Sequence, residues 1–80
     1  MRLDKYLKVS RIIKRRTIAN EACDAGRILV NEKPARASYA VKAGDRITVN
    51  LGSASHEYEV ISVVETVKKE EAQNLYKIIR

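Results

Sequence analysis

The chain has 80 residues, with 16 Lys and Arg against 10 Asp and Glu, a formal net charge of +6, one cysteine and no tryptophan. This length allows one small domain with a modest core, a lone cysteine forms no intrachain disulfide, and no apolar run approaches the roughly 20 residues that cross a bilayer. Because residues 1–16 also lack the apolar segment of a signal peptide, we expect a soluble, cytoplasmic protein without a membrane span.

Two short helices are predicted at the start of the chain, because apolar residues recur there with helical spacing. In the first helix these residues are Leu3, Tyr6 and Leu7, and Ser10-Arg11 interrupts the pattern. In the second helix, predicted from Thr17 to Ala25, they are Ile18, Ala22 and Ala25. Gly26 follows at the position of a left-handed C-terminal cap, which glycine adopts without steric cost.

After Gly26 the apolar spacing changes to the period of two that is typical of strands. Strands are predicted over 27–31, 46–51 and 57–64, with turns at 31–34, 42–45 and 52–55 and an irregular segment over 35–41. Beyond Thr66 a closing helix extends to Arg80, with an apolar stripe formed by Ala72, Leu75, Tyr76 and Ile79. The sequence thus predicts an α+β fold in which two N-terminal helices pack on a small antiparallel sheet, followed by a C-terminal helix.

The excess positive charge is concentrated in the first 16 residues. Seven bases lie there: Arg2, Lys5, Lys8, Arg11, Lys14, Arg15 and Arg16. The only acid among them is Asp4, whereas residues 17–80 carry nine bases and nine acids. A solvated helix face would interleave acids with bases, while this cluster repels itself unless a polyanion neutralises it. The pattern favours a nucleic-acid surface over an anionic membrane or an acidic protein partner.

Lys14, Arg15 and Arg16 lie at the predicted start of the second helix, where backbone N–H groups are unpaired and the helix dipole is positive. Guanidinium groups are unfavourable at this position unless an anion binds there. A phosphate would accept hydrogen bonds from both the backbone N–H groups and the arginine fork. The sequence therefore predicts a phosphate site at residues 14–16.

Four segments, in this order and spacing, resemble the S4 RNA-binding domain, which is the α-L motif of ribosomal protein S4. They are Arg2-Leu3-Asp4-Lys5-Tyr6-Leu7, Arg16-x-x-Ala19, Gly26-Arg27-Ile28-x-Val30-Asn31 and Val41-x-x-Gly44-Asp45-x-Ile47-x-Val49. The resemblance covers residues 1–51 and implies two helices packed on a small antiparallel sheet, with RNA bound by the helical face. We assign residues 1–64 to this domain and residues 65–80 to a helical extension that packs on it.

The opening Met1-Arg2-Leu3-Asp4-Lys5-Tyr6-Leu7-Lys8-Val9-Ser10-Arg11 and the closing Thr66-x-Lys68-Lys69-Glu70-Glu71-Ala72 resemble the RqcP (YabO) family of S4 proteins, for which we expect no catalytic domain. This family is related to the fifteen-kilodalton heat-shock protein. The resemblance implies a monomeric, ribosome-associated quality-control factor that binds the split large subunit carrying stalled peptidyl-tRNA. The implied partners are helix 69 of 23S rRNA, the peptidyl-site tRNA, and RqcH, which extends the stalled chain with alanine. A ribosome-assembly or general translation factor on the same fold is the alternative.

The resemblance also implies site residues. Arg2 and Arg16 match the arginines that the family places on rRNA, and Asp4 matches an acidic neighbour that orients a basic side chain. Thr17 and Asn20 are expected to support this site. The other bases complete the RNA face on charge grounds: Lys5, Lys8, Arg11, Lys14 and Arg15.

One position departs from the family pattern. The family has glycine where Glu32 follows Asn31 in this chain. Glutamate tolerates positive φ poorly, and a tight hairpin needs positive φ there, so the geometry of this turn is in question.

No residue pattern supports catalysis, a metal or another cofactor, and we expect a binding protein rather than an enzyme. Cys23 lacks a partnering histidine and is interpreted as a packed side chain. His56 is interpreted as a solvated turn residue, because a metal site needs three or four converging ligands.

The kind of nucleic acid follows from the aromatic and acidic residues. Tyr6 and Tyr76 fall on apolar helix faces, which leaves few platforms for stacking bases and favours structured RNA bound through its shape and phosphates. A DNA-binding helix-turn-helix is the competing interpretation. It is disfavoured because the second helix carries Glu21 and Asp24, which a DNA groove repels.

Overall fold

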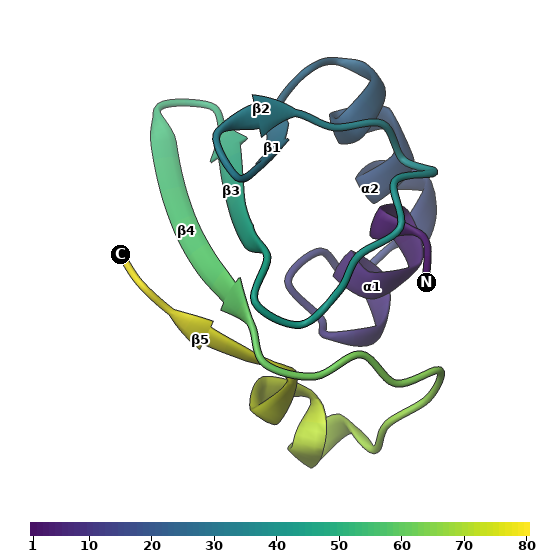
Figure 1. The fold of residues 1–80 in the computed structure, drawn as a ribbon. Helices are drawn as coiled ribbons and strands as arrows, with labels where there is room; N and C mark the ends of the chain where they lie inside the picture. The colour runs from purple at the N-terminus through teal and green to yellow at the C-terminus, as the bar shows by residue number, and fades with distance from the viewer.

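A computed structural model describes all 80 residues (Figure 1). Two helices, α1 (Leu3–Val9) and α2 (Arg16–Asp24), precede the strands β1 (Ile28–Val30), β2 (Lys33–Pro34), β3 (Arg46–Leu51) and β4 (Ala54–Val60). A 3₁₀ helix, η1 (Lys69–Leu75), and a last strand, β5 (Tyr76–Ile78), complete the chain. The strands form one antiparallel sheet in the order β2-β1-β3-β4-β5. The predicted α+β class, with helices packed on an antiparallel sheet, is confirmed.

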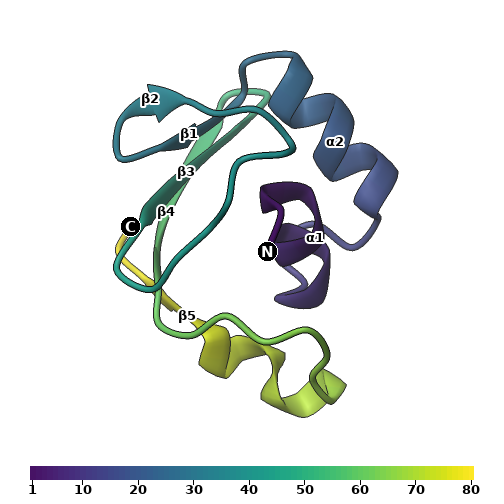
Figure 2. The ribbon, with the colours of Figure 1, turned by 45° about the vertical axis from the view of Figure 1, so that its right-hand side comes forward.

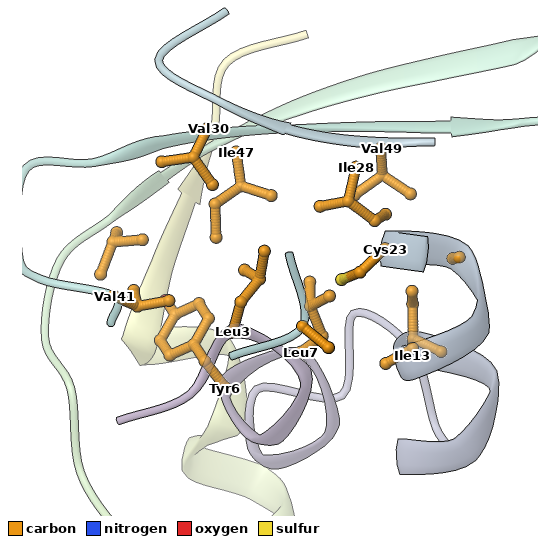
Figure 3. Close-up of a cluster of buried hydrophobic side chains, with 14 of the residues drawn as sticks. Leu3, Tyr6, Leu7, Ile13, Cys23, Ile28, Val30, Val41, Ile47 and Val49 are labelled. Carbon is orange, nitrogen blue, oxygen red and sulfur yellow. The ribbon is translucent and has the colours of Figure 1, made fainter. Parts of the chain in front are cut away.

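The hydrophobic core lies between α1, α2 and one face of the sheet (Figures 1 and 2). Alternate residues of the strands face the helices, as the twofold period of a strand requires. In β3, Ile47 and Val49 are therefore buried, while Arg46, the first residue of the strand, is exposed. Figure 3 shows Leu3 and Leu7 of α1 directed toward these strand residues.

Helix α2 exposes the residue that the sequence pattern places in the core. The predicted apolar face was Ile18, Ala22 and Ala25, but Ile18 is 45% exposed and Ala25 is exposed as well. The face packed toward α1 consists of Arg16, Ala19, Asn20 and Cys23, which follow the spacing i, i+3, i+4, i+7. The prediction was right for Ala22, which is buried, and wrong for Ile18 and Ala25, because the face toward α1 carries two polar side chains that pair with a buried carboxylate on α1.

Strand β3 has the predicted bounds, whereas β4 begins and ends earlier than predicted. It pairs with β3 from Arg46↔Glu59 to Leu51↔Ala54, and it therefore contains His56, which is exposed on the strand and does not lie in a turn. The predicted continuation to Val64 was wrong, because the chain leaves the sheet after Val60 and residues 61–68 have no regular structure.

The C-terminal segment folds back on the sheet. A helix is present, but it ends at Leu75 and not at Arg80, and the next three residues pair with β4 through Tyr58↔Ile78. The carbonyl of Leu75 accepts hydrogen bonds from the Tyr6 hydroxyl at 2.7 Å and the Ile61 N–H at 2.9 Å. These hydrogen bonds, together with the backbone pairing that the free edge of β4 offers, stabilise the observed path of the chain more than a longer helix would. Of the predicted helical stripe, Ala72 and Leu75 are buried and Ile79 is exposed.

The β1–β2 hairpin keeps a tight two-residue turn although it lacks glycine. Both Asn31 (φ 52°) and Glu32 (φ 73°) are left-handed, as a type I′ turn requires. The Asn31 side chain holds this turn, because its Oδ1 accepts the Arg46 N–H at 3.1 Å and its Nδ2 donates to Asp45 at 3.1 Å. The turn is thus imposed by contacts outside the hairpin, at the cost of backbone strain at Glu32.

Replacing Glu32 by glycine should therefore stabilise the protein. An L-residue in the left-handed region costs about 1–2 kcal/mol, so we expect Glu32→Gly to raise the free energy of unfolding by about 1 kcal/mol. For a domain of this size that corresponds to about 4–8 °C in Tm, measured by thermal denaturation. Glu32→Gln, which removes the charge and keeps the Cβ, is the control; an equal gain in that variant would contradict the strain argument.

Candidate nucleic-acid interface

The fold brings most of the N-terminal bases around one surface hollow of about 460 Å³. Five of the seven predicted bases line it: Lys5, Lys8, Arg11, Lys14 and Arg16. The first two lie on α1, the next two on the α1–α2 loop, and the last begins α2. Each has an exposed or partly exposed side chain, so the hollow presents a dense positive charge to solvent.

The buried carboxylate of Asp4 holds Arg2 and Arg16 at this surface. Asp4 is only 2% exposed, and it pairs with the Nε of Arg2 at 3.2 Å and the Nε of Arg16 at 3.4 Å. Asn20 donates a hydrogen bond to the same carboxylate at 3.1 Å, and so does the Lys5 N–H at 2.8 Å. The carboxylate is therefore fully occupied by protein groups. The arrangement agrees with the expectation that Asp4 orients basic side chains.

The partners of Asp4 determine its charge state. Burial by itself would raise the pKa of Asp4, but hydrogen bonds from Arg2, Asn20 and Arg16 outweigh it and lower the pKa to about 2. Asp4 is therefore ionised throughout the physiological range. The side chains of Arg2 and Arg16 remain about half exposed, at 50% and 47%, so each can contact Asp4 and a phosphate at once.

The start of α2 is open to an anion, as the sequence predicts. No side chain caps its N-terminus, no acid lies in its first turn, and Arg15 and Arg16 are the N-cap and the first helical residue. Arg11 in the preceding loop has φ 63°, an unusual conformation for a residue other than glycine. Arg11 and Lys14 of this loop both line the hollow. Unpaired N–H groups and several cations are therefore close together.

Two predicted residues lie beside the basic hollow. Thr17 and Asn20 line a neighbouring shallow depression together with Asp4, Arg16 and Glu21. Arg15 is exposed but does not line either depression. Arg2 is connected to the site through Asp4, and its backbone is fixed because the neighbouring Leu3 N–H donates to the Tyr39 carbonyl at 2.8 Å.

The C-terminal segment contributes residues that the sequence analysis did not include. Glu65, Thr66 and Val67 line the same hollow, and the carboxylate of Glu65 forms an ion pair with Lys5. This hydrogen bond and charge lower the pKa of Glu65. No local signal identifies this contact, because the two residues are 60 positions apart.

The cysteine and three of the tyrosines are packed inside the protein or against one another. Cys23 is buried in the core, and burial raises the pKa of its thiol to about 11. Tyr6 is buried with its hydroxyl bonded, and Tyr58 packs edge-on against the partly buried Tyr76 at 5.2 Å between ring centroids. No three His, Cys, Asp or Glu side chains converge on a point where a metal ion could bind. No helix has the length and apolar character needed to cross a bilayer.

On the opposite face of the sheet, two arginines share one glutamate. Arg46 alternates with the buried Ile47 and so points away from the helices. There it pairs with Glu57 at 3.6 Å, and Glu57 also pairs with Arg80 at 3.3 Å. Arg46 and Arg80 are thus paired on this face, whereas five of the N-terminal bases line a single hollow on the helical side.

Comparison with known proteins identifies the domain. Residues 1–47, more than half of the chain, match the S4 domain. The chain belongs to the S4 domain family. It is 52% identical over 80 residues to the RQC P-site tRNA stabilizing factor of Bacillus subtilis, covering 100% of this chain and 93% of that protein. It is 53% identical over 78 residues to the factor of the same name from Halalkalibacterium halodurans, covering 98% and 89%. It is thus a member of the family of these factors.

A solved structure shares the fold of nearly the whole chain. Heat shock protein 15 of Vibrio cholerae superimposes with a TM-score of 0.90 at 29% identity, covering 98% of this chain and 80% of that chain. The match includes the C-terminal segment, which lies outside the S4 domain match at residues 1–47. The competing helix-turn-helix interpretation was therefore wrong, because the domain is an S4 domain.

Removing the charge of Asp4 should destabilise the protein in a pH-dependent way. We expect Asp4→Asn to lose about 1–3 kcal/mol near neutral pH, because Arg2 and Arg16 then lack their anionic partner. The folded-state pKa of about 2 lies below the ordinary value of 3.8, so the stabilisation is present above pH 4 and disappears between pH 4 and pH 2.

Urea unfolding of both proteins over pH 2–7 measures this effect. The difference between wild type and Asp4→Asn should narrow as pH falls through that window. Asp24→Asn, which changes an exposed acid without an ion pair, is the control. A difference that stays constant down to pH 2 would show that packing, and not the charge of Asp4, accounts for the loss.

Proposed function

We propose that this protein binds structured RNA of the large ribosomal subunit and the peptidyl-site tRNA, and that it acts in ribosome-associated quality control. The observation that carries the proposal is the pair Arg2 and Arg16, both half exposed and both held by the buried Asp4, beside a hollow lined by five bases. The names of the Bacillus subtilis and Halalkalibacterium halodurans relatives, RQC P-site tRNA stabilizing factor, support the tRNA and quality-control part.

The chemistry of the site suits RNA phosphates better than exposed bases. Arginine forks and lysine ammonium groups bind phosphate oxygens, and Arg2 and Arg16 do so without losing their orientation because Asp4 fixes them. The tyrosines offer few free rings for stacking, since Tyr6 is buried and Tyr58 and Tyr76 pack on each other. Recognition through the shape and backbone of folded RNA follows.

The finer assignment follows from the resemblance to the RqcP family. Helix 69 of 23S rRNA is the proposed rRNA contact, and RqcH is the proposed protein partner during alanine tailing of the stalled chain. The protein acts as a monomer and as a binding factor without catalytic activity, in the cytoplasm on the split large subunit. Residues 1–64 form the RNA-binding unit in this proposal, with Thr17, Asn20 and Arg15 at the margin of its contact surface.

Substituting the two arginines tests the binding site. We expect Arg2→Ala/Arg16→Ala to lose about tenfold or more in affinity for large subunits, because two charge-assisted phosphate contacts are removed. The measurement is co-purification of tagged protein with ribosomal particles, followed by sequencing of the bound RNA. Arg46→Ala, which removes an exposed arginine from the opposite face of the sheet, should bind like wild type.

The captured particles distinguish the candidate functions. Large subunits with peptidyl-tRNA, and without small subunits, would support the quality-control role. Assembly intermediates without tRNA would instead indicate the alternative role in ribosome assembly. Because Arg16 pairs with a buried carboxylate, Tm is measured for each variant and binding is compared well below it. Full binding by the folded double variant would contradict the assigned surface.

Binding should also depend strongly on salt. The hollow and Arg2 together offer six bases, of which Lys5 is paired with Glu65, so about five phosphates are neutralised and a plot of log affinity against log salt concentration should have a slope of about −3.5 to −4.5. Fluorescence anisotropy with a labelled rRNA hairpin at several salt concentrations measures this slope. The Arg2→Ala/Arg16→Ala variant should give a shallower slope. A flat response in wild type would show that the basic hollow is not the RNA contact.

A further inference from the structure

The basic hollow contains one acid of the protein's own. Among the residues that line it, only Glu65 is acidic, and its carboxylate pairs with Lys5 across 60 residues of sequence. Its side chain is 72% exposed, so burial does not force this pairing. Charge complementarity favours it, because five bases line the hollow in which the carboxylate lies.

The segment that carries Glu65 is anchored on both sides. Val63 and Val67 pack against the hydrophobic core, while the three residues between them, Val64, Glu65 and Thr66, are exposed. Figure 2 shows this part of the chain passing close to α1 on its way from β4 to η1. The anchors keep the carboxylate within reach of Lys5, although no regular structure fixes residues 61–68.

We propose that Glu65 is an internal competitor for RNA phosphate, which occupies the position at Lys5 that a phosphate of the bound RNA takes; this inference rests on the proposed RNA-binding function. A carboxylate and a phosphate both offer anionic oxygens to the same ammonium group. RNA gains the Lys5 contact only by displacing Glu65.

This competition determines which RNAs bind well. An RNA that reaches only Lys5 exchanges one anion for another and gains little. An RNA that also engages the bases around the rest of the hollow, together with Arg2, offsets the displacement through those other contacts. Glu65 therefore raises the number of contacts that an RNA needs in order to bind, because the same displacement cost cancels an isolated contact at Lys5 but only reduces the affinity of a complete set.

Glu65→Gln removes the competing charge and nearly preserves the side-chain shape. We expect it to tighten binding of a labelled rRNA hairpin by about threefold or more at low salt, and to steepen the log–log salt slope by about 0.7–0.9, as one further phosphate is neutralised. Glu71→Gln is the matched control, since it changes the net charge equally on an exposed acid of η1 that forms no ion pair. It should leave the slope unchanged.

A double-mutant cycle ties the effect to Lys5. In a Lys5→Gln background, Glu65→Gln should no longer steepen the slope, because the ammonium group for which the two anions compete is gone. Equal affinities and slopes for Glu65→Gln and Glu71→Gln would overturn the inference. Weaker binding by Glu65→Gln would also overturn it, and would show that the carboxylate orients Lys5 for RNA.

Arg2→Ala/Arg16→Ala, measured with the same hairpin, separates the two levels of the argument. If this variant binds weakly while Glu65→Gln matches the control, the RNA site stands and the competitor does not. If the arginine variant binds as wild type does, the proposed RNA surface itself fails.

Discussion

The ion pairs and hydrogen bonds of Asp4 connect the two helices, and the positions of the functional side chains depend on them. An ionised carboxylate that is 2% exposed is tolerated only when charged or polar partners surround it, and here Arg2, Arg16 and Asn20 fill that role. Because Arg2 precedes α1 while Arg16 and Asn20 lie on α2, satisfying one buried charge fixes how α2 is rotated against α1. The same requirement leaves two guanidinium groups at the surface in defined orientations.

This constraint explains why a small core is sufficient for a precise surface. The core uses small side chains such as Ala19 and Cys23 between the helices, so apolar packing alone contributes little to their relative orientation. The carboxylate contributes a directional interaction that the apolar contacts lack. Stability and function are therefore coupled at Asp4.

The C-terminal segment has a second, independent effect on the site. The Tyr6 hydroxyl donates a hydrogen bond to the Leu75 carbonyl, which connects the end of η1 to α1. Directly after Leu75 the chain continues as β5 along the edge of β4. Covering that edge also brings residues 61–68 past the basic hollow, where Glu65 meets Lys5. An element that completes the sheet thus also places an acid among the bases. On the far face Glu57 pairs with both Arg46 and Arg80.

The sequence by itself determined the fold class, the helix α1, the bounds of β3, the left-handed Gly26 and the concentration of bases before residue 17. Each of these depends on local spacing or composition. The tertiary structure decided the rotation of α2, the end of η1 at Leu75, the strained turn at Glu32 and the presence of Glu65 in the hollow. Apolar periodicity reports burial driven by hydrophobic side chains, so it assigned Ile18 to the core. It carries no information about polar pairs such as Asp4–Asn20 and Lys5–Glu65, whose partners meet only after the chain has folded.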